Sequence, residues 1–150
     1  MNLGLIAAKW AALAPAREAI VDVPSGRRVT FAELDESVRR LANGFLSAGG
    51  LVRGDRVVIL ARNCVELVEV VLAAASAGLI AVPLNWRLGV PELERIVRDA
   101  DPGLILFGGE FAAEARALGQ SAGVNQLLGF EDKTAEGYAA FKARASGAEL

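Results

Sequence analysis

The feature that most constrains the fold is a regular alternation between short apolar runs and helical segments. Buried strands are expected over residues 56–61, 79–83 and 104–107, and helices over residues 64–77 and 91–100. A strand hidden on both faces reads as a nearly continuous apolar run, and helices between such strands are typical of parallel crossover connections. The chain is therefore predicted to be an α/β protein with a doubly wound parallel sheet.

Residues that commonly cap helices indicate the starts of two helices and the end of one. Thr30 stands three residues before Glu33 in the run TFAEL, which is the spacing of a reciprocal capping box at a helix start. Asn63 is expected to cap the helix over residues 64–77, and Gly78 is expected to end it.

Further elements are expected on both sides of this alternating region. Lys9 interrupts the apolar amino-terminal run, which is predicted to be an amphipathic helix lying on the domain and not a secretion signal. The face that this helix would bury consists of Leu3, Ile6, Trp10 and Leu13. The remaining segments are a strand over residues 27–30, a helix after it that leaves Arg39 and Arg40 toward solvent, a helix over 110–119, a strand over 124–130 and a helix over 134–145.

Composition narrows the classes of function that this chain can perform. No histidine is present, which removes the commonest general base near neutral pH, the imidazole metal ligand and any Ser-His-Asp triad. The 16 basic and 18 acidic side chains give a formal net charge of -2 with no long run of either sign. No surface for nucleic acid and no metal site are therefore expected.

One cysteine and one apolar run bear on where the protein works. Cys64 is the sole cysteine, so an internal disulfide is impossible, and a buried, unreactive thiol in a cytoplasmic protein is expected. The apolar run over residues 70–84 is shorter than the ~18 residues that a membrane span requires, and Gly78 and Pro83 interrupt it. With 53% hydrophobic residues, the chain is predicted to form a single α/β domain over residues 1–150.

The clearest candidate for ligand binding follows the strand predicted over residues 79–83. Asn85, Trp86 and Arg87 come directly after this strand, and the carboxyl ends of parallel strands are where open α/β sheets place ligand-binding groups. The phosphate-binding patterns GxxxxGK[ST] and GxGxxG are both absent from the chain. A nucleotide site of either of these kinds is therefore not expected.

Other polar residues favour structural roles. The Gly-Gly-Glu run at residues 108–110 follows a strand and could present amides to an anion, but so short a run is more typical of a tight turn. Glu66 and Glu69 fall in the first turns of a helix, where carboxylates usually cap the helix or are solvated. No nucleophile stands beside a suitable base, so a free-standing enzyme is not predicted.

Three segments in order along the chain resemble one known family. They are TFAEL, RRLANGFLSAGGLVRGDRVVILARNCVELVEVVLAAASAGLIAVPLNWRL and ELERIVRDADPGLILF, and they closely resemble the amino-terminal region of the adenylate-forming acyl-CoA synthetases, the AMP-binding ligases. The resemblance covers residues 15–107. It implies the amino-terminal part of the large domain of these enzymes, in a chain that is a fragment of a larger ligase.

This resemblance implies an enzyme that uses ATP and Mg²⁺ to form an acyl-adenylate and then passes the acyl group to coenzyme A. The family's phosphate loop, magnesium ligand, ribose-binding Asp and catalytic Lys have no counterpart in this chain, so no catalytic residue is assigned and the fragment alone is expected to be inactive. The implied partners are the remainder of the ligase chain and a carboxylic acid of undetermined class, and a homodimer is left open. The run Asn85-Trp86-Arg87-Leu88 is similar to that of coenzyme A ligases.

Arg87 carries the one expectation for a binding site. The resemblance places it where some family members meet the nucleotide end of coenzyme A, and a planar guanidinium suits a phosphate. The alternative is a surface ion pair with Glu92 or Glu94 of the following helix. For the whole chain, two other hypotheses stay open: a non-enzymatic α/β module that binds a small ligand, and an interaction module whose apolar face is covered by a partner or a second copy.

Overall fold

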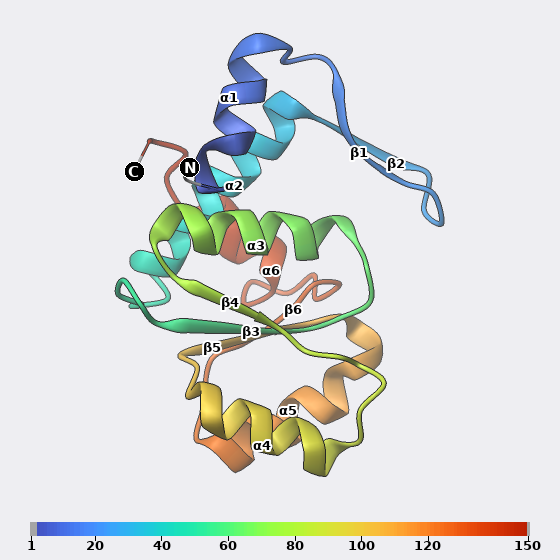
Figure 1. Cartoon of the computed structure of the whole chain (residues 1–150), viewed down its shortest axis with the longest axis vertical. Coiled ribbons are helices and arrows are strands. Elements are labelled where there is room, and N and C mark those ends of the chain that lie inside the picture. Colours follow the sequence, from blue (N-terminus) through green and yellow to red (C-terminus); the bar gives the residue numbers. More distant parts are fainter. Residues whose placement is uncertain (1–2, 150) are drawn as a thin grey trace.

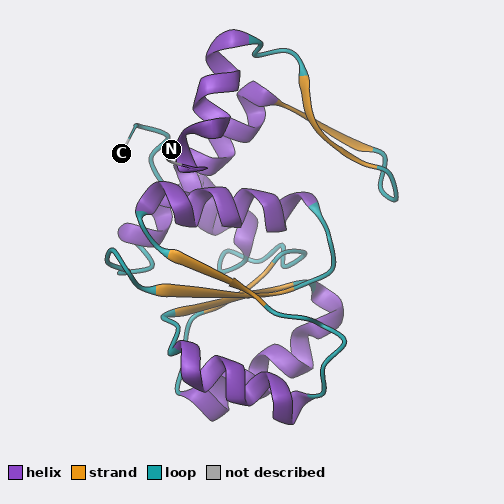
Figure 2. Ribbon diagram, in the orientation of Figure 1, coloured by secondary structure: helices purple, strands orange, loops and turns teal. Residues whose placement is uncertain are grey.

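The computed structural model describes residues 3–149, and its centre is a parallel sheet of four strands (Figures 1 and 2). The strands are β3 (Arg56–Leu60), β4 (Ile80–Pro83), β5 (Leu104–Phe107) and β6 (Leu127–Gly129). Their order across the sheet is β4-β3-β5-β6, so the direction in which strands are added reverses after β4. This is the doubly wound parallel sheet that the alternating sequence predicts.

Helices cover both faces of the sheet (Figure 1). One face carries α3 (Val65–Ala77), with α2 (Phe31–Leu46) and α6 (Tyr138–Arg144) on the same side. The other face carries α4 (Val90–Ala100) and α5 (Ala112–Ala122). The helices predicted over residues 64–77, 91–100, 110–119 and 134–145 correspond to α3, α4, α5 and α6, with ends that shift by a few residues.

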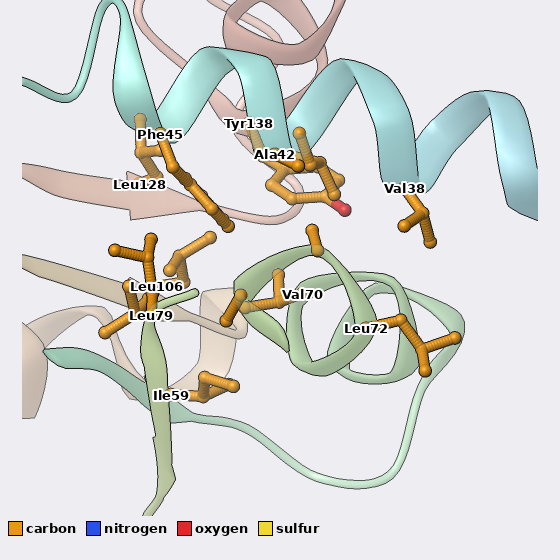
Figure 3. Packing of buried hydrophobic residues seen from close by; sticks show 14 of the residues in the cluster. Val38, Ala42, Phe45, Ile59, Val70, Leu72, Leu79, Leu106, Leu128 and Tyr138 are labelled. Carbon is orange, nitrogen blue, oxygen red and sulfur yellow. The ribbon is translucent and has the colours of Figure 1, made fainter. Parts of the chain in front are cut away.

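Successive residues of β3 point to opposite faces of the sheet and enter two separate cores. Val57 and Ile59 belong to the core that includes side chains of α2, α3 and α6, which Figure 3 shows from close by. Val58 and Leu60 belong to a second core with side chains of α4 and α5. Because side chains alternate along a strand, burial on both faces requires the unbroken apolar run of β3.

Two of the three predicted helix ends are confirmed. The Thr30 hydroxyl accepts a hydrogen bond from the backbone N–H of Glu33 at 3.3 Å, and the Glu33 carboxylate accepts one from the backbone N–H of Thr30 at 2.8 Å. Gly78 ends α3 in the left-handed conformation, with φ 72°. The prediction for Asn63 is wrong, because α3 begins at Val65, its first buried residue, and Cys64 occupies the N-cap position without a side-chain hydrogen bond.

The amino-terminal helix packs through a different face from the predicted one. A 3-10 turn, η1 (Leu3–Leu5), leads into α1 (Ile6–Leu13), and the buried residues are Gly4 and Ala7. A Cβ atom added at Gly4 would lie 2.5 Å from backbone atoms of Ser76 in α3, so only a glycine fits there. The face predicted to be buried is exposed and consists of Leu3, Ile6, Trp10 and Leu13. Close backbone approach decides which face packs, and larger side chains would prevent it.

An antiparallel hairpin projects from the body of the molecule (Figure 1). Its second strand, β2 (Arg27–Thr30), coincides with the strand predicted over these residues, whereas its first strand, β1 (Glu18–Asp22), has no counterpart among the predicted strands. Gly26 in the connecting turn has φ 71°, a conformation that glycine adopts without strain. The extended conformation of β1 depends on its pairing with β2, which its own short sequence does not signal.

Arg39 and Arg40 are only partly exposed, whereas the sequence predicted that both would lie toward solvent. The segment that follows α6 lies against α2, where Arg39 donates a hydrogen bond to the Gly147 carbonyl at 2.7 Å and Arg40 donates one to the Ala145 carbonyl at 3.0 Å. Both arginines also pair with Glu36 on α2 itself. The expectation holds only in part, because a distant part of the chain covers some of this face of the helix.

Candidate functional site

Three loops meet at the carboxyl edge of the sheet, where β3, β4 and β5 end. The Leu84 N–H donates to the Ile59 carbonyl at 2.8 Å and the Gly108 N–H donates to the Leu60 carbonyl at 3.0 Å, so hydrogen bonds tie the loops after β4 and β5 to β3. In doubly wound sheets the carboxyl edge at the reversal of strand order is the usual ligand site. The loops contribute one group of side chains here, the Trp86 cluster: Arg62, Trp86, Arg87, Glu110 and Phe111.

The indole of Trp86 is the centre of the Trp86 cluster. The guanidinium carbons of Arg62 and Arg87 lie 4.6 Å and 4.5 Å from the centroid of its ring. The ring of Phe111 lies 6.1 Å away at an angle of 38°, and Arg62 also pairs with Glu110 at 3.6 Å. Because the face of an aromatic ring attracts cations, one side chain can hold two like charges at this edge.

Asn85 forms a turn directly after β4. The Asn85 side-chain oxygen accepts a hydrogen bond from the backbone N–H of Arg87 at 3.1 Å, and the Asn85 carbonyl accepts one from the Leu88 N–H at 3.0 Å. This type of turn is typical of asparagine. It lets Trp86 pack on the loop after β5.

Arg87 makes neither of the ion pairs that the sequence leaves open. Within residues 3–149, no carboxylate lies within ion-pair distance of its guanidinium, which is exposed. Glu92 instead accepts a hydrogen bond from the Gly89 N–H at 3.0 Å, and Glu94 pairs with Arg98 at 3.7 Å. The ion-pair alternative is wrong because α4 already uses both carboxylates.

The glycines after β5 lead into a single 3-10 turn, η2 (Gly109–Phe111). The Gly109 N–H, an amide that an anion would need, donates to the carboxylate of Glu131 at 2.6 Å. The chain therefore supplies its own carboxylate to this amide, in agreement with the tight turn that was expected. The arginines remain the cationic groups at this edge.

A second polar group is centred on the buried Glu69 of α3, beside α6. It is the Glu69 cluster: Arg27, Ser37, Glu69, Tyr138 and Lys142. Glu69 is 1% exposed, and its carboxylate accepts hydrogen bonds from the Tyr138 hydroxyl at 2.6 Å and from Lys142 Nζ at 2.9 Å. Lys142 also donates to the Ser37 hydroxyl at 2.6 Å, and Arg27 lies 3.9 Å from Glu69.

The expectation that Glu69 is a solvated group at a helix start is therefore wrong. A signal for the cluster does exist in the sequence, because Glu69 is a carboxylate within an apolar helix and a buried carboxylate needs donors. Tyr138 and Lys142 are four residues apart and so share one face of α6. No local pattern, however, indicates that this face meets α3.

Burial changes the acidity of two groups on this side of the sheet. Burial, together with the negative charge of Glu69, raises the pKa of the Tyr138 hydroxyl well above its usual value. Burial also raises the pKa of the Cys64 thiol to about 11. Cys64 was predicted to be buried, but it is half-buried. Its thiol is protonated near neutral pH, which agrees with the expected lack of reactivity.

At the carboxyl edge, the face of the Trp86 ring holds the guanidinium groups of Arg62 and Arg87, and the exposed guanidinium of Arg87 can bind an anion. Among residues 3–149, no group of three or more metal-ligating side chains could hold a metal ion. In the same part of the chain, no helix is both long and apolar enough to cross a membrane.

Comparisons with known proteins give the chain a family. Residues 7–146 match the model of the family described as AMP-binding enzyme. Feruloyl-CoA synthase from Amycolatopsis sp is 43% identical over 93 residues, which cover 62% of this chain and 19% of that protein. The long-chain-fatty-acid–CoA ligase FadD13 of Mycobacterium tuberculosis is 32% identical over 117 residues, which cover 78% of this chain and 23% of that protein.

Solved structures agree with this match. The N-terminal domain of FACL13 from Mycobacterium tuberculosis superimposes with a TM-score of 0.87 at 29% identity, covering 100% of this chain and 38% of that chain. The anthranilate CoA ligase AuaEII superimposes with a TM-score of 0.88 over 99% of this chain and 29% of its own, and its 20% identity supports the fold alone. This chain thus spans about a fifth of the length of the curated relatives above. It belongs to the AMP-binding enzyme family.

Proposed function

We propose that this chain is the amino-terminal portion of an ATP-dependent acid–CoA ligase that releases AMP. The complete enzyme activates a carboxylic acid as an acyl-adenylate and transfers the acyl group to the thiol of coenzyme A. The observation that carries the proposal is the match of residues 7–146 to the family, because it extends over nearly the whole chain. The likeness to a long-chain-fatty-acid–CoA ligase supports a place in fatty acid metabolism.

Within that enzyme, we assign this chain a contact with coenzyme A through Arg87. The guanidinium is exposed at the carboxyl edge, and no carboxylate among residues 3–149 pairs with it. Arg62, by comparison, has Glu110 at 3.6 Å. A phosphate at the nucleotide end of coenzyme A would accept two parallel hydrogen bonds from the free guanidinium.

The groups that act on ATP belong to the remainder of the ligase chain, which is the first proposed partner. The sequence contains no glycine-rich phosphate loop, and residues 3–149 hold no cluster that fits Mg²⁺. The residues of this chain therefore hold neither the ATP phosphates nor Mg²⁺ in the proposed reaction. We expect the 150-residue chain, as one α/β domain, to release no pyrophosphate from ATP with any carboxylic acid.

The test is Arg87→Ala in the complete ligase. The KM for coenzyme A in thioester formation should rise roughly ten- to hundredfold, because one charge-assisted contact of about 1.5 to 3 kcal/mol is lost. Exchange of ATP with pyrophosphate, which needs no coenzyme A, is the internal control. Arg98→Ala is the matched control variant, since Arg98 is an exposed arginine paired with Glu94. An unchanged KM for coenzyme A in Arg87→Ala would discard the contact.

The exposed apolar face of α1 bears on what this chain contacts in the complete ligase. Its apolar side chains would be covered by the remainder of the ligase chain, with a cytoplasmic homodimer as the competing arrangement. Trp10→Asp separates the two in the complete ligase. If a second copy covers α1, light scattering should show a dimer that this variant breaks. If the remainder of the chain covers α1, the variant should lower the melting temperature without changing the mass.

A non-enzymatic module is the competing hypothesis for the chain as a whole. It predicts that the 150-residue chain binds a small ligand or a protein partner by itself. Reading the coding sequence beyond Leu150 separates the hypotheses, because a downstream phosphate loop supports the ligase and its absence opposes it.

A further inference from the structure

The side chain of Arg87 is held in place before any ligand arrives. Its guanidinium carbon lies 4.5 Å from the centroid of the Trp86 ring, although the side chain is exposed. Its backbone is fixed as well, because its N–H donates to the Asn85 side chain at 3.1 Å. An exposed arginine without such contacts would sample many rotamers, and binding would have to restrict them.

The Trp86 ring is itself anchored on the neighbouring loops. Phe111, after β5, packs against it with ring centroids 6.1 Å apart. Arg62, after β3, lies over the ring at 4.6 Å and is tied to Glu110 at 3.6 Å. The two arginines on the ring therefore differ, since the charge of Arg62 already has a carboxylate partner among residues 3–149 and that of Arg87 has none.

We propose that Trp86 is a positioning residue for coenzyme A, whose indole holds the Arg87 guanidinium ready for a phosphate at the carboxyl edge. This inference rests on the proposed function, in which Arg87 contacts coenzyme A. The indole touches neither the phosphate nor the reacting atoms. Its contribution is to restrict Arg87 beforehand, so that less freedom is lost on binding.

The experiment compares two replacements of Trp86 in the complete ligase. Trp86→Leu keeps apolar volume but removes the ring face, whereas Trp86→Phe keeps a ring. Trp86→Leu should raise the KM for coenzyme A about two- to fivefold, which corresponds to the loss of one exposed cation–π contact. Trp86→Phe should raise it less, and the KM for ATP should not change in either variant.

Two controls separate positioning from general damage to the structure. In an Arg87→Ala background, Trp86→Leu should cause no further rise, because the group that it positions is gone. Trp10→Leu is the matched control, since Trp10 also stacks on a phenylalanine, Phe31, with ring centroids 5.7 Å apart, and lies on α1 and not at the carboxyl edge. It should leave the KM for coenzyme A unchanged.

The outcomes distinguish this inference from the proposed function. If Arg87→Ala raises the KM but Trp86→Leu does not, or if the two effects simply multiply, the positioning role is overturned and the Arg87 contact stands. Equal effects of Trp86→Leu and Trp86→Phe also overturn it, because the ring face is then irrelevant. If Arg87→Ala changes nothing, the proposed contact fails first, and the positioning role falls with it.

Discussion

The Glu69 cluster and the Trp86 cluster arrange similar charged groups in opposite ways. In the Glu69 cluster the carboxylate is buried and receives hydrogen bonds from Tyr138 and Lys142. In the Trp86 cluster the exposed guanidinium of Arg87 lies on a ring and has no carboxylate partner among residues 3–149. A charge can stay unpaired only where water solvates it, so only the second arrangement leaves a group available to a ligand.

The difference predicts where substitutions have their effect. Removing one partner of a buried, paired charge leaves the other uncompensated in a medium of low dielectric constant, which lowers the stability of the fold. Removing an exposed arginine loses only a contact that water and salt already screen, so the stability of the fold changes little. Substitutions in the Glu69 cluster should therefore change the free energy of unfolding, and substitutions in the Trp86 cluster should change binding.

The largest effect is expected for Lys142→Met, which removes the closer of the two cations beside Glu69. The buried carboxylate then keeps only the Tyr138 hydroxyl as a close donor, with Arg27 farther away at 3.9 Å, and the free energy of unfolding should fall by about 3 to 5 kcal/mol. Urea unfolding of the 150-residue chain, followed by circular dichroism, measures it. The double variant Glu69→Leu with Lys142→Met is the control and should be less destabilised than Lys142→Met alone. A loss below about 1 kcal/mol in the single variant would contradict the paired, buried arrangement.

Tyr138→Phe should have the next largest effect, about 1.5 to 3 kcal/mol, because it removes a hydrogen bond to a charged group. It should also change the pH dependence. The folded pKa of Tyr138 is raised, so its contribution is full below the unfolded pKa of about 10 and is lost as the pH rises above that value. Urea unfolding between pH 8 and 11 should therefore show a shallower alkaline loss in the phenylalanine variant. Because Tyr138 is the only tyrosine, absorbance of its phenolate checks the pKa directly, and titration near 10 in the folded chain would refute the prediction.

The loop after β3 contrasts a partly buried group with an exposed one, because the half-buried Cys64 lies two residues after the exposed Arg62. With its pKa raised to about 11, the Cys64 thiol should react with iodoacetamide at pH 8 roughly ten- to hundredfold more slowly than in the urea-unfolded chain. The rate should still be increasing at pH 10. A plateau near pH 9 would show a thiol that burial does not affect.

Arg87→Ala should have the smallest effect on stability, under about 1 kcal/mol, since it removes one exposed contact with a ring. Urea unfolding of the chain measures this change, with Lys142→Met as the reference for a buried group. The same substitution is expected to weaken coenzyme A binding strongly in the complete ligase. A loss of stability above about 2 kcal/mol would show that Arg87 supports the fold and would remove the contrast between the clusters.

Local sequence patterns predicted most of the central architecture and part of the candidate site. The unbroken apolar run of β3 could be recognised because a strand buried on both faces has no polar position to interrupt it. The capping box of Thr30 and Glu33 and the turn at Asn85 could be recognised because each joins residues two or three apart. The position of Arg87 just beyond a strand followed from the same local reasoning, but its place on the Trp86 ring did not.

The sequence by itself determined the α/β class, the order of the central strands and helices along the chain, and the family. Only the tertiary structure decided which face of α1 packs, that β1 pairs with β2, that the segment after α6 covers Arg39 and Arg40, and that Glu69 is buried under α6. The physical reason is the range of the interactions. Strand burial, helix caps and turns depend on neighbouring residues, whereas the contacts of Glu69 with Tyr138 and Lys142 join residues far apart in sequence, which come together only when whole helices pack.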